Sequence, residues 1–348
     1  MKRIKVVLSL LFHVLLMISI FSCDLHEFPK EEEDSQTAKV LLHLNYDTLL
    51  PLHKEVEYIS RAVQTEENYD VRYVINVHRS EDEQRFSREP DTCICVTKDE
   101  IDQINHTVEI DLGAGFYKFM IWTDYVDEGS QRGKHYNTDS FEEIVLQEDY
   151  RGNTDFRDAF CGESEMLAVK AGDMREVTVY MERPLAKYRF VTTDLNDFVL
   201  RIMQPVMQKV GNTVEVEDEA LLRTVNLNDF RVVFYYTGFL PISFNMFTDK
   251  PADAITGVHF DGTLTRLNDT EAELGFDYVF VNGSESSVPV QIEVYDKDGT
   301  LISRSSSIDV PIVRSKQTIV RGKFLTTQAS SDIGINPGFD GEWDYEIK

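Results

Sequence analysis

The chain has 348 residues, and its 42% hydrophobic and 11% aromatic content is enough for packed cores, which argues against a disordered tail. Its 35 basic and 61 acidic residues give a net charge of −26. A field of this sign repels phosphate backbones and so argues against nucleic-acid binding, and we interpret the acidic excess as the surface of an exposed, soluble protein.

The first 22 residues have the layout of a secretory signal. Three basic residues lie among the first five, and the apolar run 6–21 that follows has sixteen residues, fewer than the ~20 that usually span a bilayer. The run is followed by Ser22-Cys23, which resembles the lipobox of bacterial lipoproteins, where a peptidase cuts before the cysteine and the thiol carries a diacylglycerol. We therefore predict a lipoprotein signal peptide over residues 1–22 and lipid attachment at Cys23. The alternative is an uncleaved helix with an incidental cysteine.

Residues 23–36 show no apolar periodicity and contain the charge run 30–34. Such a segment is typical of a solvated spacer, so we predict a flexible acidic tether between the lipid and the first domain. No later segment is apolar over a membrane-spanning length.

Alternation of apolar and polar residues predicts half-buried antiparallel strands over 70–79, 106–112, 116–125 and 175–182. In the first of these, one face carries Val71, Tyr73, Ile75 and Val77, and the other carries Arg72, Asn76 and His78. Residues 97–105 could form one or two helical turns. The polar stretch 127–158 is interpreted as extended loops with one strand around 143–146.

The second half repeats this pattern. Strands are predicted within 186–194, 230–239, 276–282, 288–310, 316–325 and 342–348, and residues 296–299 make the hairpin turn inside 288–310. The apolar spacing of 194–208 predicts a short helix that is capped by Asp194 and ends or kinks at Pro205. We predict an all-β protein of two antiparallel β-sandwich domains in tandem, residues 37–185 and 186–348, with little helix.

Besides Cys23, the cysteines are Cys93, Cys95 and Cys161. Cys93 and Cys95 share one face of a strand and cannot easily bridge each other. Either could pair with Cys161 in an oxidising compartment, and this possible disulfide stays open. The histidines are scattered, which argues against a zinc site.

Motifs for catalysis are absent from the sequence, including G-x-S-x-G, the P-loop and H-E-x-x-H, so we expect neither an enzyme nor a cofactor. A carboxylate pair of the glycosidase type cannot be judged by counting, because acids are abundant. Asp296 begins a D-x-D-G pattern, but position twelve is Ser307 rather than the glutamate of a calcium loop, so we interpret it as a turn. Trp122 and Tyr125 would suit a carbohydrate platform, but a strand of this composition is more often core.

Several stretches resemble the FimB-type fimbrial anchor subunits, lipoproteins of type V pili in bacteria of the Bacteroides–Porphyromonas kind. They are LGAGFYKFMIWTDYVDEG, FRDAF followed by Cys161-Gly162, MERPLAKYRFVTTDL, YYTGFLPISFNMFTDKP, VPIVRSKQTIVRGKFLT and PGFDGEW. The similarity runs from the lipobox to the last strand. Cys161 stands where an aromatic residue is expected, so the resemblance implies no disulfide there.

The resemblance implies two transthyretin-like sandwiches, lipidation at Cys23 and an outer-membrane, surface-exposed location. It implies a role at the base of a fimbria, holding the polymer and helping to end or regulate assembly. The implied partner is the shaft subunit, fimbrillin, bound by strand pairing, and no catalytic residue is implied. The last strand, 342–348, could engage a neighbour, but we expect it to complete its own domain. Glu31, Glu32, Glu33 and Asp34 look similar to the acidic export signal of surface lipoproteins, which is a hypothesis.

Two other functions compete with the anchor. A surface glycan-binding lipoprotein would show exposed aromatic residues on one sheet face. A hydrolase would need a cleft with converging acids or a metal, and the motifs give it little support.

Overall fold

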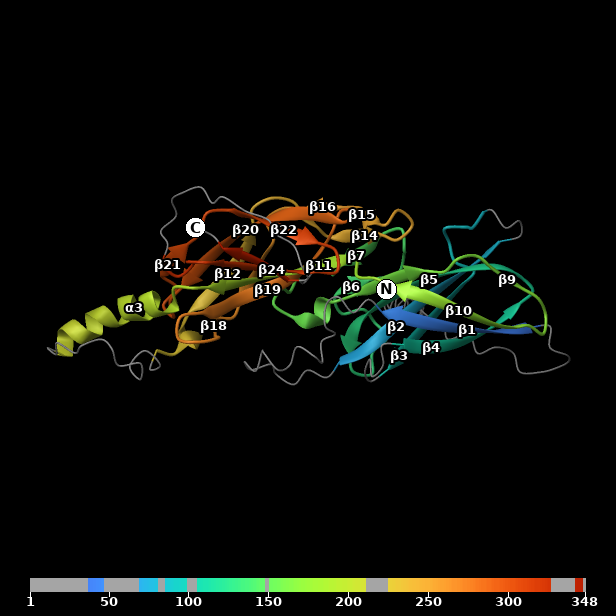
Figure 1. Ribbon diagram of the computed structural model, residues 1–348, viewed down its shortest axis with the longest axis horizontal. Helices are drawn as coiled ribbons and strands as arrows, with labels where there is room; N and C mark the ends of the chain where they lie inside the picture. The colour runs from blue at the N-terminus through green and yellow to red at the C-terminus, as the bar shows by residue number, and fades with distance from the viewer. Residues whose placement is uncertain are drawn as a thin grey trace, which may run out of the picture. The chain divides into compact units, whose positions relative to one another are not determined.

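The computed structural model describes residues 37–46, 69–80, 85–98, 105–147, 150–210, 225–326 and 342–346 (Figure 1). The described residues from 37 onward belong to one compact unit. The predicted signal peptide, Cys23 and the acidic tether lie outside the described residues, as do residues 99–104 of the predicted helical turns. Within the described part of the chain, no helix is both long enough and apolar enough to cross a membrane.

The first half of the molecule, β1 to β10, is built from two sheets. One has the order β10-β1-β4, and the other has the order β3-β2-β5-β8, with β9 also pairing with β5. The inner faces share a core that includes Val40, Leu42, Ile75 and Phe119, all fully buried. The bounds are β1 (Thr37–Tyr46), β2 (Tyr69–Ser80), β3 (Thr92–Lys98), β4 (Asn105–Gly113), β5 (Gly115–Asp127), β6 (Tyr136–Asn137), β7 (Ile144–Leu146), η1 (Asp155–Arg157), β8 (Phe160–Glu163), β9 (Leu167–Val169) and β10 (Met174–Met181).

The second half, β11 to β24, packs the sheet β18-β19-β11-β23-β24 against the sheet β17-β12-β20-β21, with β22 also pairing with β20. Their core includes Phe190, Phe234, Val290 and Ile312, all fully buried. The bounds are β11 (Leu185–Thr192), α3 (Leu195–Val210), η2 (Leu227–Asp229), β12 (Arg231–Tyr236), β13 (Leu240–Pro241), β14 (Ser243–Asn245), β15 (Lys250–Pro251), β16 (Ala254–Ile255), β17 (His259–Gly262), β18 (Thr265–Arg266), β19 (Ala272–Phe280), β20 (Glu285–Tyr295), β21 (Leu301–Arg304), β22 (Ile308–Val313), β23 (Gln317–Gly322) and β24 (Glu342–Glu346).

The predicted all-β architecture is confirmed, and most strand pairs are antiparallel. Among the described strands, three pairs run parallel: β1 with β10, β11 with β23, and β23 with β24. The sequence pattern did not reveal them, because side-chain alternation is the same in both directions and only the connection distinguishes them. Pairing of β24 with β23 confirms that the last strand completes a sheet of its own chain. The domain boundary at residue 185 stays a prediction.

The helix α3 continues past Pro205 to Val210, so of the two predicted alternatives an end at Pro205 is wrong, and a kink there stays a prediction. A proline removes one backbone bond, to the carbonyl four residues earlier, while the bonds of the adjoining turns remain. The Asp194 carbonyl accepts the first helical bond from Phe198 at 2.9 Å, as expected of a cap residue. Its carboxylate, however, accepts from the backbone of Thr326 at 2.8 Å, which ties the helix start to the segment after β23.

The hairpin turn at residues 296–299 is confirmed. One Asp296 oxygen accepts from the backbone nitrogens of Asp298 at 2.9 Å and Thr300 at 2.8 Å. Gly299 has a φ of +80°, which a residue with a side chain rarely adopts. The carboxylate at the start of the D-x-D-G pattern is therefore used by the turn itself.

Two neighbouring leucines of β1 test which face of this strand is the core. Leu42 is fully buried, whereas Leu41 lies on the other face and is half-buried. We expect Leu42→Ala to lower the free energy of unfolding by about 2–5 kcal/mol, because it leaves a cavity, and Leu41→Ala by about 1 kcal/mol or less, because it does not. Urea unfolding monitored by circular dichroism measures both, and equal losses would contradict this assignment of faces.

Candidate functional site

Strand β2 is buried on both faces, whereas the sequence pattern predicted a half-buried strand. Arg72, Asn76 and His78 are at most 6% exposed. They lie on the face of the sheet that points away from the first core. His78 packs against Phe247 of the second half, whereas Arg72 is covered by the segment 131–136 of the first half, to whose backbone carbonyls it donates. The prediction failed because polar residues normally mark a solvated face, whereas here they line an internal junction.

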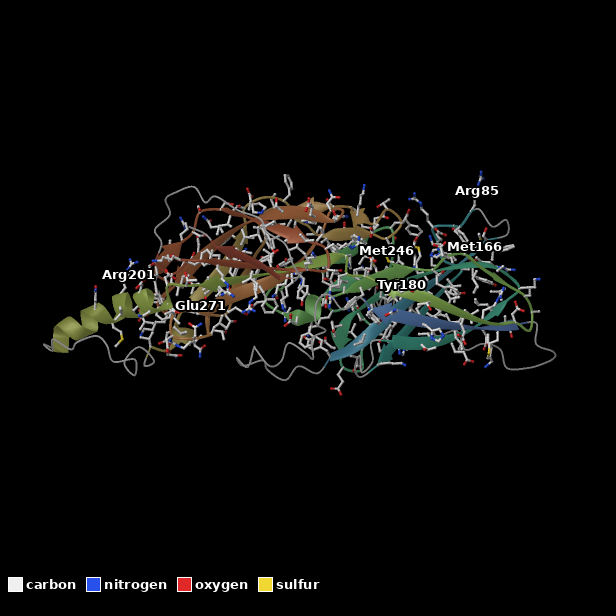
Figure 2. All side chains as sticks on the ribbon, in the orientation of Figure 1. Arg85, Met166, Tyr180, Arg201, Met246 and Glu271 are labelled. Atoms are coloured by element: carbon white, nitrogen blue, oxygen red, sulfur yellow. The ribbon has the colours of Figure 1, made fainter. Side chains whose placement is uncertain are left out.

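The junction has an apolar cluster of its own, to which both halves contribute. Trp122 of β5 is fully buried in it, and Tyr125 is 8% exposed on the opposite face of β5, so the interpretation of both residues as core is confirmed. Met246, labelled in Figure 2, enters this cluster from the second half. The cluster comprises Val74, Met120, Trp122, Tyr136, Phe141, Ile144, Ala159, Cys161, Leu185, Phe244, Met246, Phe276, Tyr278 and Phe280.

A small sheet crosses the junction. Its order is β15-β14-β7-β6, so strands of the second half pair with strands of the first, and Figure 1 shows orange β14 beside green β7. Phe244 lies opposite Ile144 in the antiparallel register. Two further backbone bonds, from Leu146 to the carbonyl of Ile242 (2.7 Å) and from Met246 to that of Phe141 (2.9 Å), extend the pairing.

Buried ion pairs reinforce this backbone connection. Arg157 of η1 donates to Asp277 of β19, and the two side chains are 2% and 1% exposed. Lys187 of β11 donates to Asp155 at 2.5 Å, again between the two halves and with little exposure. Because a buried charge without a partner is costly, these pairs fix η1 against β11 and β19.

Hydroxyl groups complete the coordination of the two carboxylates. Asp277 accepts hydrogen bonds from the hydroxyl groups of Tyr236 at 2.7 Å and Tyr150 at 2.5 Å. Asp155 accepts one from the hydroxyl group of Tyr278 at 2.8 Å. Burial lowers the pKa of Arg157, but the Asp277 carboxylate together with Tyr150 and Tyr136 outweighs burial and raises the pKa, so the guanidinium stays charged. The arrangement is a rigid connection between two sandwiches, with no nucleophile and base poised for catalysis among these residues.

The cysteines do not form the disulfide that the sequence left open. The sheet β3-β2-β5-β8 separates the cysteines. Cys95 of β3 lies opposite Val74 of β2, Val74 lies opposite Trp122 of β5, and Trp122 lies opposite Cys161 of β8. Three strand spacings put about 14 Å between the outer two, whereas a disulfide needs Cα atoms within about 7 Å. Cys93 lies two register pairs further along β3, and Cys161 is a buried thiol at the junction. A bond from either to Cys161 is therefore incompatible with this sheet.

Predicted site residues and observed site residues overlap little. Cys23 lies outside the described residues. Within the described ranges, no group of three or more His, Cys, Asp or Glu residues is arranged to hold a metal ion. Asp155, Arg157, Lys187 and Asp277 were not predicted as a site. A usable signal was present for Asp277, because it is the only charged residue in the predicted strand 276–282.

Removing one charge of the junction tests its importance. We expect Asp277→Asn to lower the free energy of unfolding by about 3–5 kcal/mol, because it leaves Arg157 buried and uncompensated. The matched control is Glu109→Gln, which breaks an exposed pair with Lys39 and should leave the free energy of unfolding nearly unchanged. Chemical denaturation measures both. Similar losses for the two variants would show that the buried pair has no special role.

Comparison with known proteins gives a family but no activity. No curated protein matches the chain. Similar solved structures include a candidate cell adhesion protein from Bacteroides eggerthii, 13% identical over 92% of this chain and 100% of that chain, with a TM-score of 0.41. Two others are from Porphyromonas gingivalis. The fimbrial anchor protein Mfa2 is 10% identical over 76% of this chain and 81% of that chain, with a TM-score of 0.36. The tip fimbrial protein Mfa3, with a C-terminal truncation, is 8% identical over 79% and 81%, with a TM-score of 0.33.

At TM-scores below 0.5 these likenesses carry no argument about function. The family model is different, because it matches residues 30–348 and so nearly the whole chain. Its description names no activity. The chain belongs to this family of unknown function (DUF6562).

Proposed function

We propose that the protein is a lipid-anchored surface subunit that holds a fimbria at its base on the outer membrane and helps to end or regulate its assembly. The sequence supports this through the lipobox at Cys23 and the resemblance to fimbrial anchor subunits. The proposed role needs no catalytic group, in keeping with the junction described above.

The place of β1 is the structural observation that carries the proposal. β1 begins at Thr37, fourteen residues after Cys23, so it is the first described element beyond the proposed lipid. It is the central strand of its sheet, with eight residues in register with β10 on one side and nine with β4 on the other. A pull on the lipid would act along this strand and load both ladders in shear, so many hydrogen bonds would have to break together.

The junction suits the same role. A load that enters through β1 must reach the second half before it reaches a partner held there. The pairing of β14 with β7 and the buried pairs of Arg157 and Lys187 provide that connection. The partner would be a fimbrial shaft subunit, fimbrillin, that adds a strand to an open sheet edge, where backbone hydrogen bonds supply the affinity.

Deletion of the gene tests the anchor. We expect a deletion strain to shed fimbriae into the medium, and complementation with the wild-type gene to restore retention. A Cys23→Ala gene should fail to do so, because the protein would lack the lipid and would leave the membrane fraction. Immunoblots of cells and medium, with electron microscopy of fimbrial length, measure this. Fimbriae that stay cell-bound and unchanged in length after deletion would contradict the proposal.

Pulling geometry tests the role of β1 separately. In a soluble chain from residue 24 with Cys93→Ser and Cys95→Ser, handles at Gln36→Cys and Lys297→Cys would load β1 along its length. Handles at Gln131→Cys and Lys297→Cys would bypass it. We expect higher unfolding forces for the first pair in optical-tweezer measurements. Equal forces would remove β1 as the load-bearing strand, whatever the deletion strain shows.

A further inference from the structure

A groove lies beside strand β17, on the second half of the molecule. Its volume is about 370 Å³, and it is formed where the segment before η1 runs along β17 and the start of β12. The residues that matter for its chemistry are Tyr150, Arg151, Gly152, Arg231, His259 and Asp261. None of them belongs to the predicted tether, to β1 or to the buried ion pairs.

One wall of the groove is held rigidly. A side chain at Gly152 would lie 2.3 Å from the ring of Phe260, so glycine lets this segment rest directly on β17. Two contacts hold the Tyr150 side chain in place. Its hydroxyl donates to Asp277, and the guanidinium of Arg157 lies over its ring, 4.3 Å from the centroid. The groove is therefore preformed, as small-molecule sites usually are.

The rim carries a charged pair with unused hydrogen-bonding capacity. Arg231 donates through Nε at 3.0 Å and through Nη2 at 2.8 Å, and both bonds end on Oδ1 of Asp261. The two side chains are 60% and 59% exposed. Nη1 of the arginine and Oδ2 of the aspartate thus remain for a ligand, one as a donor and the other as an acceptor.

Flat ring surfaces lie next to this pair. The imidazole of His259 stacks on Tyr235 with the ring centroids 5.6 Å apart and an angle of 27° between the planes. Tyr295 is opposite Arg231 in the ladder between β12 and β20. His259 is exposed and the two tyrosines are half-buried, so this sheet face offers ring surface to solvent beside the groove.

We propose that this groove binds a neutral saccharide. A pyranose ring has hydroxyl groups that both donate and accept, and these match the donor and acceptor of the arginine–carboxylate pair. It also has a C–H face that packs against flat rings. The long-range field of a chain with a net charge of −26 disfavours polyanions and leaves a neutral sugar unaffected, and at the rim the charge of Arg231 is balanced by Asp261. This activity would be adhesive and does not rest on the proposed anchoring role.

An array of immobilised neutral oligosaccharides, probed with the full-length protein in detergent, tests the proposal, followed by titration calorimetry with the strongest soluble hit. We expect Arg231→Ala and His259→Ala each to weaken binding about tenfold or more, the change that loss of ~1.4 kcal/mol produces. Asp261→Asn, which keeps the shape of the rim, should weaken it in the same direction. The matched control is Arg88→Ala, which breaks the exposed Arg88–Glu142 pair on the first half of the molecule and should bind as the wild type does.

Three results would overturn the proposal. They are the absence of binding to every neutral saccharide, binding that the groove variants leave unchanged, and binding confined to anionic glycans. Thermal unfolding of each variant separates lost binding from lost folding, and Asp261→Asn decides the outcome if Arg231→Ala is unfolded. Retention of fimbriae is measured separately, so the anchor and the saccharide site can fail independently.

Discussion

The contact between Arg157 and Asp277 removes two opposite charges from water at the place where the two sandwiches meet. A buried guanidinium is stable only with a partner, so η1 cannot move away from β19 without a cost of several kcal/mol. Lys187 and Asp155 repeat the same constraint a short distance away. The cost of separating these charges adds to the apolar cluster of the junction in holding the two halves together.

Other features of the molecule depend on this constraint. With η1 held, the segment before it is held too, and β7 can pair with β14. The outer face of β2 is then an interior surface, which explains why it carries Arg72, paired with Asp124 at 2.6 Å, instead of solvated lysines or glutamates. Polar groups on that face are tolerated because each charge finds a partner.

The same carboxylate links the junction to the groove beside β17. Asp277 accepts from Tyr150, whose ring forms part of the groove wall, so the geometry that connects the two sandwiches also shapes a surface for a ligand. Load bearing and recognition both need a surface that does not deform. In the two proposed roles, Asp277 would contribute to both, whereas β1 would serve only load bearing.

Much of the fold follows from the sequence alone, because strand formation depends on local alternation. The strands around residues 70–79, 116–125 and 288–310, the turn at Asp296 and the all-β class were all predictable from neighbours along the chain. The interpretation of Trp122 as core was also correct. A local pattern, however, contains no information on strand direction, so the parallel pairs of β1 and β23 were missed. It also contains none on sheet order, which separates Cys95 from Cys161 by two strands. Only the tertiary structure decided that both faces of β2 are buried and that Asp277 meets Arg157, because these contacts join residues far apart in the chain whose proximity no short-range pattern records.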